Sequence, residues 1–80
     1  MLIIYTKTGC PWCNEAREFL KRRNISFEER GVLSNPEFFD ELRQKSGQEK
    51  TPTLDLNGEI LADTDAEAIE EFLKKQGILN

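Results

Sequence analysis

The chain of 80 residues is long enough for one domain, residues 1–80, and too short for a second. Its net charge of −4 argues against a nucleic-acid-binding protein, because phosphate binding needs a basic face. No stretch approaches the roughly 18 consecutive apolar residues of a membrane-spanning helix, so we expect no membrane span. The first residues have no basic stretch before an apolar run and no small-residue cleavage site, so no secretory signal is expected. For so small a domain we expect a monomer.

The chain has two cysteines and no histidine. A tetrahedral zinc site needs four Cys or His ligands, so we expect no metal site within one chain. Disulfide-stabilised secreted domains usually spread four or more cysteines along the sequence, whereas Cys10 and Cys13 are close neighbours. This spacing is typical of redox chemistry in a reducing compartment, and we expect a cytoplasmic location.

The first half of the chain predicts strand, helix and strand. The apolar run 2–5 is typical of a buried strand. The pair Cys10-Pro11 then opens a helix, because proline is favoured at the first helical position, and Asn24 is expected to end it. A second strand is expected around residues 25–30, where apolar and polar residues alternate in part.

The next segment predicts a helix and a hairpin. Ser34 and Glu37 have the spacing of a capping box, and Gly47 is a natural C-terminal cap. Residues 53–56 alternate polar and apolar side chains, as a half-buried strand does. The Asn-Gly pair that follows is a strong signal for a tight turn into a partner strand over 59–62.

A last helix is expected to start at a second capping box, Thr64 with Glu67, and to end at Gly77. The order is therefore β-α-β-α-β-β-α. Two strands joined by a helix are expected to be parallel with a right-handed crossover, and the final pair is an antiparallel hairpin. We predict an α/β fold with a four-stranded mixed sheet and helices on both faces.

The Cys10-Pro11-Trp12-Cys13 motif carries the predicted chemistry. Its cysteines would lie one helical turn apart, near enough for a disulfide. Unpaired amides and partial positive charge at the helix start favour a thiolate at Cys10, and a nearby Lys7 would add to this effect. Cys13 suits the resolving role, attacking the mixed disulfide that Cys10 forms with a substrate. We therefore predict a thiol–disulfide oxidoreductase with Cys10 and Cys13 as catalytic residues.

The same residues allow other interpretations. A purely structural disulfide fits poorly, because so short a ring removes almost no chain entropy. Trp12 is expected at the loop tip against a substrate, with a place in the core as the alternative. The pair Thr51-Pro52 begins a strand, and a cis peptide there would bring the Thr51 backbone beside the cysteines. From the residues alone a trans peptide is favoured, since cis is about 5–6% of X-Pro bonds.

The segments 5–13, 51–52 and 63–65 resemble the glutaredoxin family of the thioredoxin superfamily, and the resemblance covers residues 2 to about 73. It implies a thioredoxin-like fold and a dithiol enzyme that reduces protein disulfides or glutathione mixed disulfides. In that family the proline matching Pro52 is cis.

The resemblance also implies glutathione as a co-substrate, with no tightly bound cofactor. Lys7 would meet a glutathione carboxylate, and the Thr51 backbone would pair with its cysteinyl part. Thr64 and Asp65, at a helix start suited to anions, would hold the γ-glutamyl end. The residues expected to bind glutathione or another substrate are Lys7, Pro11, Trp12, Thr51, Pro52, Thr64 and Asp65.

The sequence departs from the family pattern at two places. Lys50-Thr51-Pro52 stands where Thr-Val-Pro is usual, and Leu61-Ala62 stands where a Gly-Gly pair is usual. Since glycines let a peptide approach the backbone closely, side chains at the second place are expected to crowd glutathione. One alternative is therefore a redoxin reduced by thioredoxin reductase that donates electrons to ribonucleotide reductase or a similar enzyme.

Two further alternatives belong to other classes. An iron–sulfur cluster carrier would use Cys10 from two chains and two glutathiones. Pro11 argues against it by stiffening the loop that a cluster must fit. A structural or interaction module is the other alternative, and it leaves the placement of the two thiols unexplained.

Overall fold

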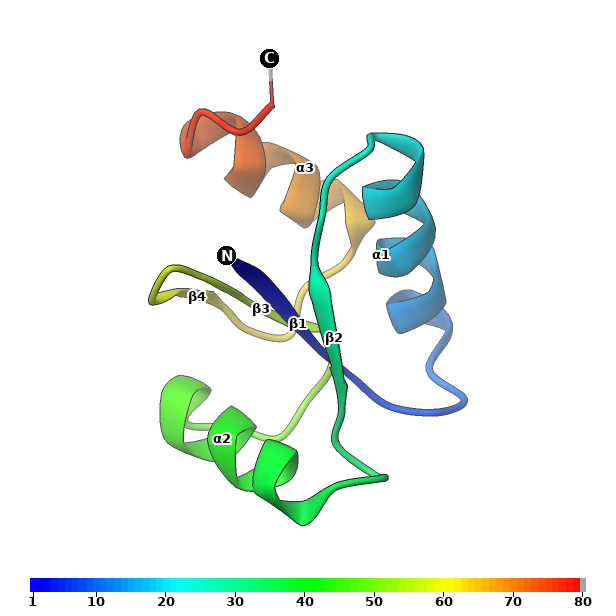
Figure 1. Cartoon of the computed structure of the whole chain (residues 1–80), viewed down its shortest axis with the longest axis vertical. Coiled ribbons are helices and arrows are strands. Elements are labelled where there is room, and N and C mark those ends of the chain that lie inside the picture. Colours follow the sequence, from blue (N-terminus) through cyan, green and yellow to red (C-terminus); the bar gives the residue numbers. More distant parts are fainter. Residues whose placement is uncertain (80) are drawn as a thin grey trace.

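The computed structural model describes residues 1–79, which form four strands and three helices in the predicted order (Figure 1). The strands are β1 (Leu2–Thr6), β2 (Glu28–Gly31), β3 (Thr53–Leu56) and β4 (Glu59–Leu61). The helices are α1 (Pro11–Arg22), α2 (Pro36–Ser46) and α3 (Ala66–Lys75). None of these helices is long and apolar enough to cross a membrane.

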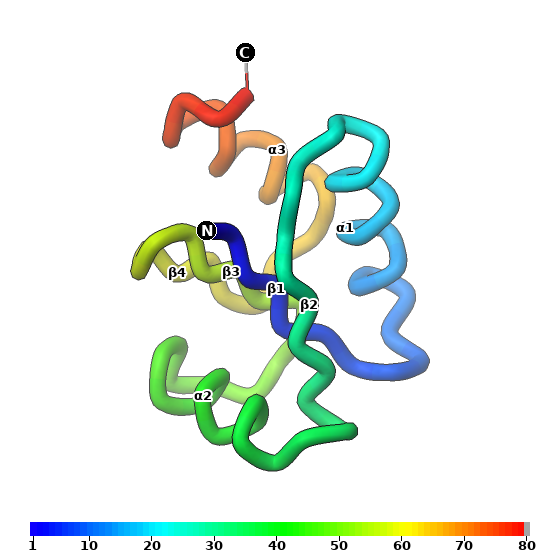
Figure 2. Tube along the Cα trace, in the orientation of Figure 1, coloured from blue at the N-terminus to red at the C-terminus, as the bar shows by residue number. Residues whose placement is uncertain are grey.

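The strands form one four-stranded mixed sheet, as predicted, in the order β2-β1-β3-β4, which the sequence did not predict. β1 runs parallel to β2 and antiparallel to β3, and β4 pairs antiparallel with β3. The views along the sheet place α1 and α3 on one face and α2 on the other (Figures 1 and 2). Because β1 lies between β2 and β3, the chain enters α1 from the middle of the sheet and not from its edge.

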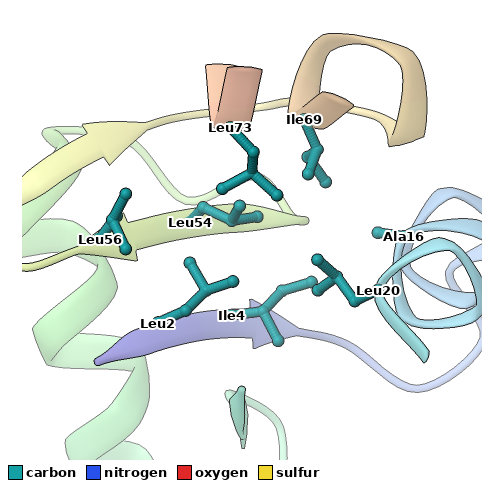
Figure 3. Close-up of a cluster of buried hydrophobic side chains, with 8 residues drawn as sticks. All are labelled: Leu2, Ile4, Ala16, Leu20, Leu54, Leu56, Ile69 and Leu73. Atoms are coloured by element: carbon teal, nitrogen blue, oxygen red, sulfur yellow. The ribbon is translucent and has the colours of Figure 1, made fainter. Parts of the chain in front are cut away.

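The larger part of the core lies between the sheet and the helices α1 and α3 (Figure 3). Apolar side chains from both central strands meet those of the two helices, and the cluster comprises Leu2, Ile4, Ala16, Leu20, Leu54, Leu56, Ile69 and Leu73. Each fully buried leucine or isoleucine contributes roughly 1.5–3 kcal/mol relative to an exposed one. Through Ala16 and Leu20 this cluster anchors α1, the helix that carries the cysteines at its start, to the sheet.

The face covered by α2 combines apolar packing with a partly buried ion pair. Asp55 of β3 is 7% exposed, and its Oδ2 accepts a hydrogen bond of 2.8 Å from Nζ of Lys45. The same Nζ donates to the Tyr5 hydroxyl, which donates to Glu41. The prediction of a half-buried β3 was therefore wrong, because α2 covers the face on which its polar residues lie.

This pairing governs the titration of Asp55. Burial acts to raise the pKa of its carboxyl. Hydrogen bonds from the Lys45 ammonium and the Gly58 amide outweigh burial and hold the pKa below its ordinary value. The carboxylate is therefore charged and paired near neutral pH.

The first capping prediction was wrong by one residue. Asn35, not Ser34, caps α2, and its side chain accepts a hydrogen bond of 3.0 Å from the Glu37 amide. The Ser34 hydroxyl instead donates to the carbonyl of Gly31 at 3.0 Å. The serine is thus engaged in the preceding turn, and Asn35 stands directly before the proline that begins the helix.

Most other expected boundaries are confirmed or move slightly. Gly47 caps α2 in the left-handed region, as predicted, with φ of 70°. The helix α1 ends at Arg22, so Asn24 lies just beyond it with φ of 57°. The second strand begins at Glu28 rather than at residue 25, because Ile25 packs against the core instead of pairing.

Candidate active site

The two cysteines lie where the chain passes from β1 into α1. Gly9, with φ of 80°, makes the turn, and Cys10 follows as the N-cap residue of α1. The Cys10 sulfur accepts a hydrogen bond of 3.2 Å from the Cys13 amide, in the place where a Ser or Asp oxygen usually caps a helix. The sulfur is thereby held at the positive end of the helix dipole, as the sequence predicted.

The cysteines differ in exposure. Cys13 is fully buried, whereas Cys10 is 9% exposed, and both thiols are free. The more buried position of Cys13 confirms the prediction. A substrate therefore reaches Cys10 first.

A distant segment completes the surroundings of Cys10. The Thr51-Pro52 peptide is cis, as the resemblance implied and the residues alone did not. The Cys10 sulfur lies 3.8 Å from the Thr51 carbonyl oxygen and 3.8 Å from its hydroxyl oxygen. The hydroxyl donates to the sulfur, which is a contact that sequence reasoning missed, because it considered only the Thr51 backbone.

These contacts shift the pKa values of the two thiols in opposite directions. Burial acts to raise the pKa of the Cys10 thiol. Hydrogen bonds from the Cys13 thiol and amide, the Thr51 hydroxyl and the Trp12 amide outweigh burial and lower that pKa below its ordinary value. Burial, together with the hydrogen bond that its thiol donates to Cys10, raises the pKa of Cys13. Cys10 is therefore the thiol that ionises first.

Lys7 lines the groove beside the Cys10 sulfur. The hydrogen-bond donors that lower the pKa of the Cys10 thiol belong to Cys13, Thr51 and Trp12. An added effect of the Lys7 ammonium on this ionisation stays a prediction. The position of Lys7 suits contact with a bound substrate.

A groove of about 450 Å³ opens over the Cys10 sulfur. It is lined by Lys7, Gly9, Cys10, Pro11, Trp12, Lys50, Thr51, Asp63, Thr64 and Asp65. Every residue predicted to bind a substrate lines it except Pro52, which is buried. Trp12 is 59% exposed, so its predicted exposure is confirmed and the core alternative is wrong, although Trp12 lies in the first turn of α1 and not in a loop.

The start of α3 borders the same groove. Asp65, not Thr64, caps this helix, and its Oδ1 accepts a hydrogen bond of 2.9 Å from the Ala68 amide. The Thr64 amide donates to the carbonyl of Pro52 at 2.9 Å, which ties the helix start to the cis peptide. The second capping-box prediction was therefore wrong, because the Thr64 hydroxyl faces Asp65 rather than the helix amides.

The expected crowding of the groove by Leu61 and Ala62 is wrong. Leu61 packs against the core, and neither residue lines the groove. Asp63 lines it instead, with a left-handed φ of 49°, and its carboxylate lies 3.9 Å from Nζ of Lys50. Sequence reasoning missed both as site residues. For Asp63, the signal in the sequence was its position between a predicted strand and a predicted helix cap.

A second groove of about 470 Å³ lies along the end of α2 and contains neither cysteine. Its lining consists of charged residues, amides and one glycine, namely Asp40, Arg43, Gln44, Gly47, Gln48 and Glu49. It offers no nucleophile. Within residues 1–79, no three His, Cys, Asp or Glu side chains gather where they would hold a metal ion.

A sequence profile of the glutaredoxin family matches residues 2–61. The protein belongs to the glutaredoxin family. It is 31% identical over 75 residues to an uncharacterized glutaredoxin-like 8.6 kDa protein in the rubredoxin operon of Clostridium pasteurianum, a match that covers 94% of this chain and 100% of that protein. Members of the family act on glutathione and on disulfide-containing substrates.

Solved structures confirm the thioredoxin-like fold of this glutaredoxin. The crystal structure of the thioredoxin-like protein BC3987 superposes with a TM-score of 0.83 at 30% identity, covering 91% of this chain and 100% of that one. The solution structure of glutaredoxin from Brucella melitensis gives a TM-score of 0.71 at 28% identity, covering 98% and 86%. Membership of this family fits a redox role for the paired cysteines.

Proposed function

We propose that the protein is a dithiol glutaredoxin that reduces protein disulfides and glutathione mixed disulfides through Cys10 and Cys13. The observation that carries this proposal is the placement of the Cys10 sulfur. It lies at the start of α1, 3.2 Å from the Cys13 amide and 3.8 Å from the Thr51 hydroxyl. These donors stabilise the thiolate, which is the nucleophilic form of cysteine.

The reaction proceeds by two thiol–disulfide exchanges. The Cys10 thiolate attacks one sulfur of the substrate disulfide and forms a mixed disulfide with it. The other substrate sulfur leaves as a thiolate and takes a proton from water. Cys13 then loses its proton and attacks the Cys10 sulfur, which releases the second substrate thiol and leaves a Cys10–Cys13 disulfide. Two electrons have passed to the substrate.

Glutathione is the proposed co-substrate that restores the dithiol, and two molecules are oxidised to glutathione disulfide. A cysteinyl residue joined to Cys10 would lie along the Thr51 backbone, whose carbonyl oxygen is 3.8 Å from the sulfur. Lys7 would meet a carboxylate, and Thr64 with Asp65 would hold the γ-glutamyl end. The groove that these residues line supports this arrangement. We propose that the protein acts as a monomer in the cytoplasm.

One observation favours a second reductant. Asp63 brings a carboxylate into the groove beside Lys50, where an anionic peptide would otherwise find a cation. This supports the alternative of a redoxin that is reduced by thioredoxin reductase and passes electrons to an enzyme such as ribonucleotide reductase. In both versions Cys10 is the attacking thiol.

The test is disulfide reduction measured with each reductant in turn, glutathione with its reductase and then thioredoxin reductase, using wild type, Cys10→Ser and Cys13→Ser. We expect Cys10→Ser to lose turnover with both reductants. We expect Cys13→Ser to keep glutathione-dependent removal of glutathione from a protein and to lose dithiol reduction. Turnover by Cys10→Ser contradicts the proposed nucleophile. Loss of both activities in Cys13→Ser contradicts the glutathione route, and a brown protein would point to a cluster carrier.

A further inference from the structure

An ion pair lies in the groove beside the nucleophile. The Lys50 ammonium and the Asp63 carboxylate are 3.9 Å apart, and their side chains are 74% and 58% exposed. Lys50 comes from the segment that precedes the cis peptide, and Asp63 from the turn between β4 and α3. Both side chains therefore meet any ligand that occupies the groove with Cys10.

The backbone holds Asp63 at this place. Its φ of 49° lies in the left-handed region, which few residues other than glycine adopt and which Asn and Asp tolerate best. The Asp63 amide donates to the Thr53 hydroxyl at 3.3 Å, and the next amide, of Thr64, donates to Pro52 at 2.9 Å. A glycine in this conformation would leave the groove without the carboxylate.

With Asp63 in place, the groove is lined by as many negative as positive side chains. Lys7 and Lys50 line it as cations, and Asp63 and Asp65 line it as anions. A ligand with net negative charge meets the Asp63 carboxylate and finds Lys50 already paired. The Asp63 carboxylate does not repel a ligand without net charge, and it attracts a cationic one.

We propose that Asp63 is a specificity-determining residue that disfavours disulfides of net negative charge, such as glutathione conjugates, and favours uncharged and cationic ones. This inference rests on the proposed function, since it concerns which disulfide reaches Cys10. Exposed charge pairs contribute about 0.2–1 kcal/mol, so the discrimination expected from one carboxylate is roughly 1.5- to 5-fold.

The test compares Asp63→Asn with wild type in single turnovers of the reduced protein. Asparagine keeps the size of the side chain and tolerates the left-handed backbone. The probes are glutathione disulfide, which is anionic, bis(2-hydroxyethyl) disulfide, which is uncharged, and cystamine, which is cationic. In Asp63→Asn we expect the rate ratio of the anionic to the uncharged probe to rise about 1.5- to 5-fold and the cationic-to-uncharged ratio to fall.

Two controls separate this effect from a change in overall charge. Asp40→Asn removes the same charge from an exposed position on α2 outside the groove, and its ratios should equal those of wild type. Lys50→Gln should lower the ratio of the anionic to the uncharged probe. In about 1 M salt, where the Debye length is about 3 Å, the effect of Asp63→Asn should shrink sharply.

The possible failures are distinguishable. If reduced wild type does not react with the uncharged probe through Cys10, the proposed function is wrong. If it reacts, and folded Asp63→Asn gives the same ratios as Asp40→Asn, the proposed role of Asp63 is overturned.

Discussion

Replacing Thr51 with valine removes one of the donors that stabilise the Cys10 thiolate. The Thr51 hydroxyl lies 3.8 Å from the Cys10 sulfur, and valine keeps the branched shape while losing the O–H. Because the charged sulfur loses more than the neutral thiol does, we expect Thr51→Val to raise the pKa of Cys10. The Cys13 amide, at 3.2 Å, remains as a donor, so the pKa of Cys10 should still lie below its ordinary value, but by less than in wild type.

The magnitude follows from the strength of the lost hydrogen bond. Hydrogen bonds to charged groups contribute roughly 1.5–3 kcal/mol, and for a 3.8 Å contact to sulfur we take about 1–1.4 kcal/mol. That free energy corresponds to about a five- to tenfold loss of thiolate at a pH below the pKa. A thiolate of higher pKa is a better nucleophile, with a Brønsted coefficient of about 0.4–0.5, so the alkylation rate should fall only about two- to fourfold.

The assay follows thiolate absorbance in the ultraviolet and the alkylation rate across a pH titration. Thr51→Ser keeps the hydroxyl and should titrate close to wild type. Thr8→Val makes the same substitution at an exposed threonine outside the groove and should leave the titration unchanged. If folded Thr51→Val ionises at the same pH as wild type, the hydroxyl does not stabilise the thiolate, and this account of the site is refuted.

Two further predictions concern stability. Lys45→Met leaves the Asp55 carboxylate buried without its partner. We expect it to lower the free energy of unfolding by about 1–3 kcal/mol, less than for a fully buried pair because the Lys45 side chain is 33% exposed. In wild type the pKa of Asp55 is held below its ordinary value of 3.8, so the ionised carboxylate stabilises the folded protein. This stabilisation is present at a pH above 3.8 and is lost as the pH falls through the pKa that Asp55 has in the folded state. Urea unfolding at a series of pH values measures both the free energy of unfolding and its dependence on pH. If Lys45→Met loses stability in acid as steeply as wild type does, the pairing is contradicted. Leu20→Ala, which empties a fully buried position between α1 and the sheet, should cost about 2–5 kcal/mol in the same assay. A loss below 1 kcal/mol would show that the core closes around the missing side chain.

The sequence by itself determined the features that depend on neighbours along the chain. The order of strands and helices follows from local patterns of apolar residues. The position of Cys10 at the start of α1 follows from the proline after it. The placement of Cys13 one turn further in follows from helix geometry. For the same reason, the caps predicted at Ser34 and Thr64 were wrong by only one residue.

Only the tertiary structure decided which distant groups surround the sulfur. Thr51 is 41 positions from Cys10 in the sequence, and no local pattern shows that its hydroxyl donates to the sulfur. Likewise, Asp63 enters the groove because β4 and α3 fix the turn between them, and Asp55 is buried because α2 covers its face of the sheet. Such contacts depend on how the helices and strands pack, which residue spacing alone does not specify.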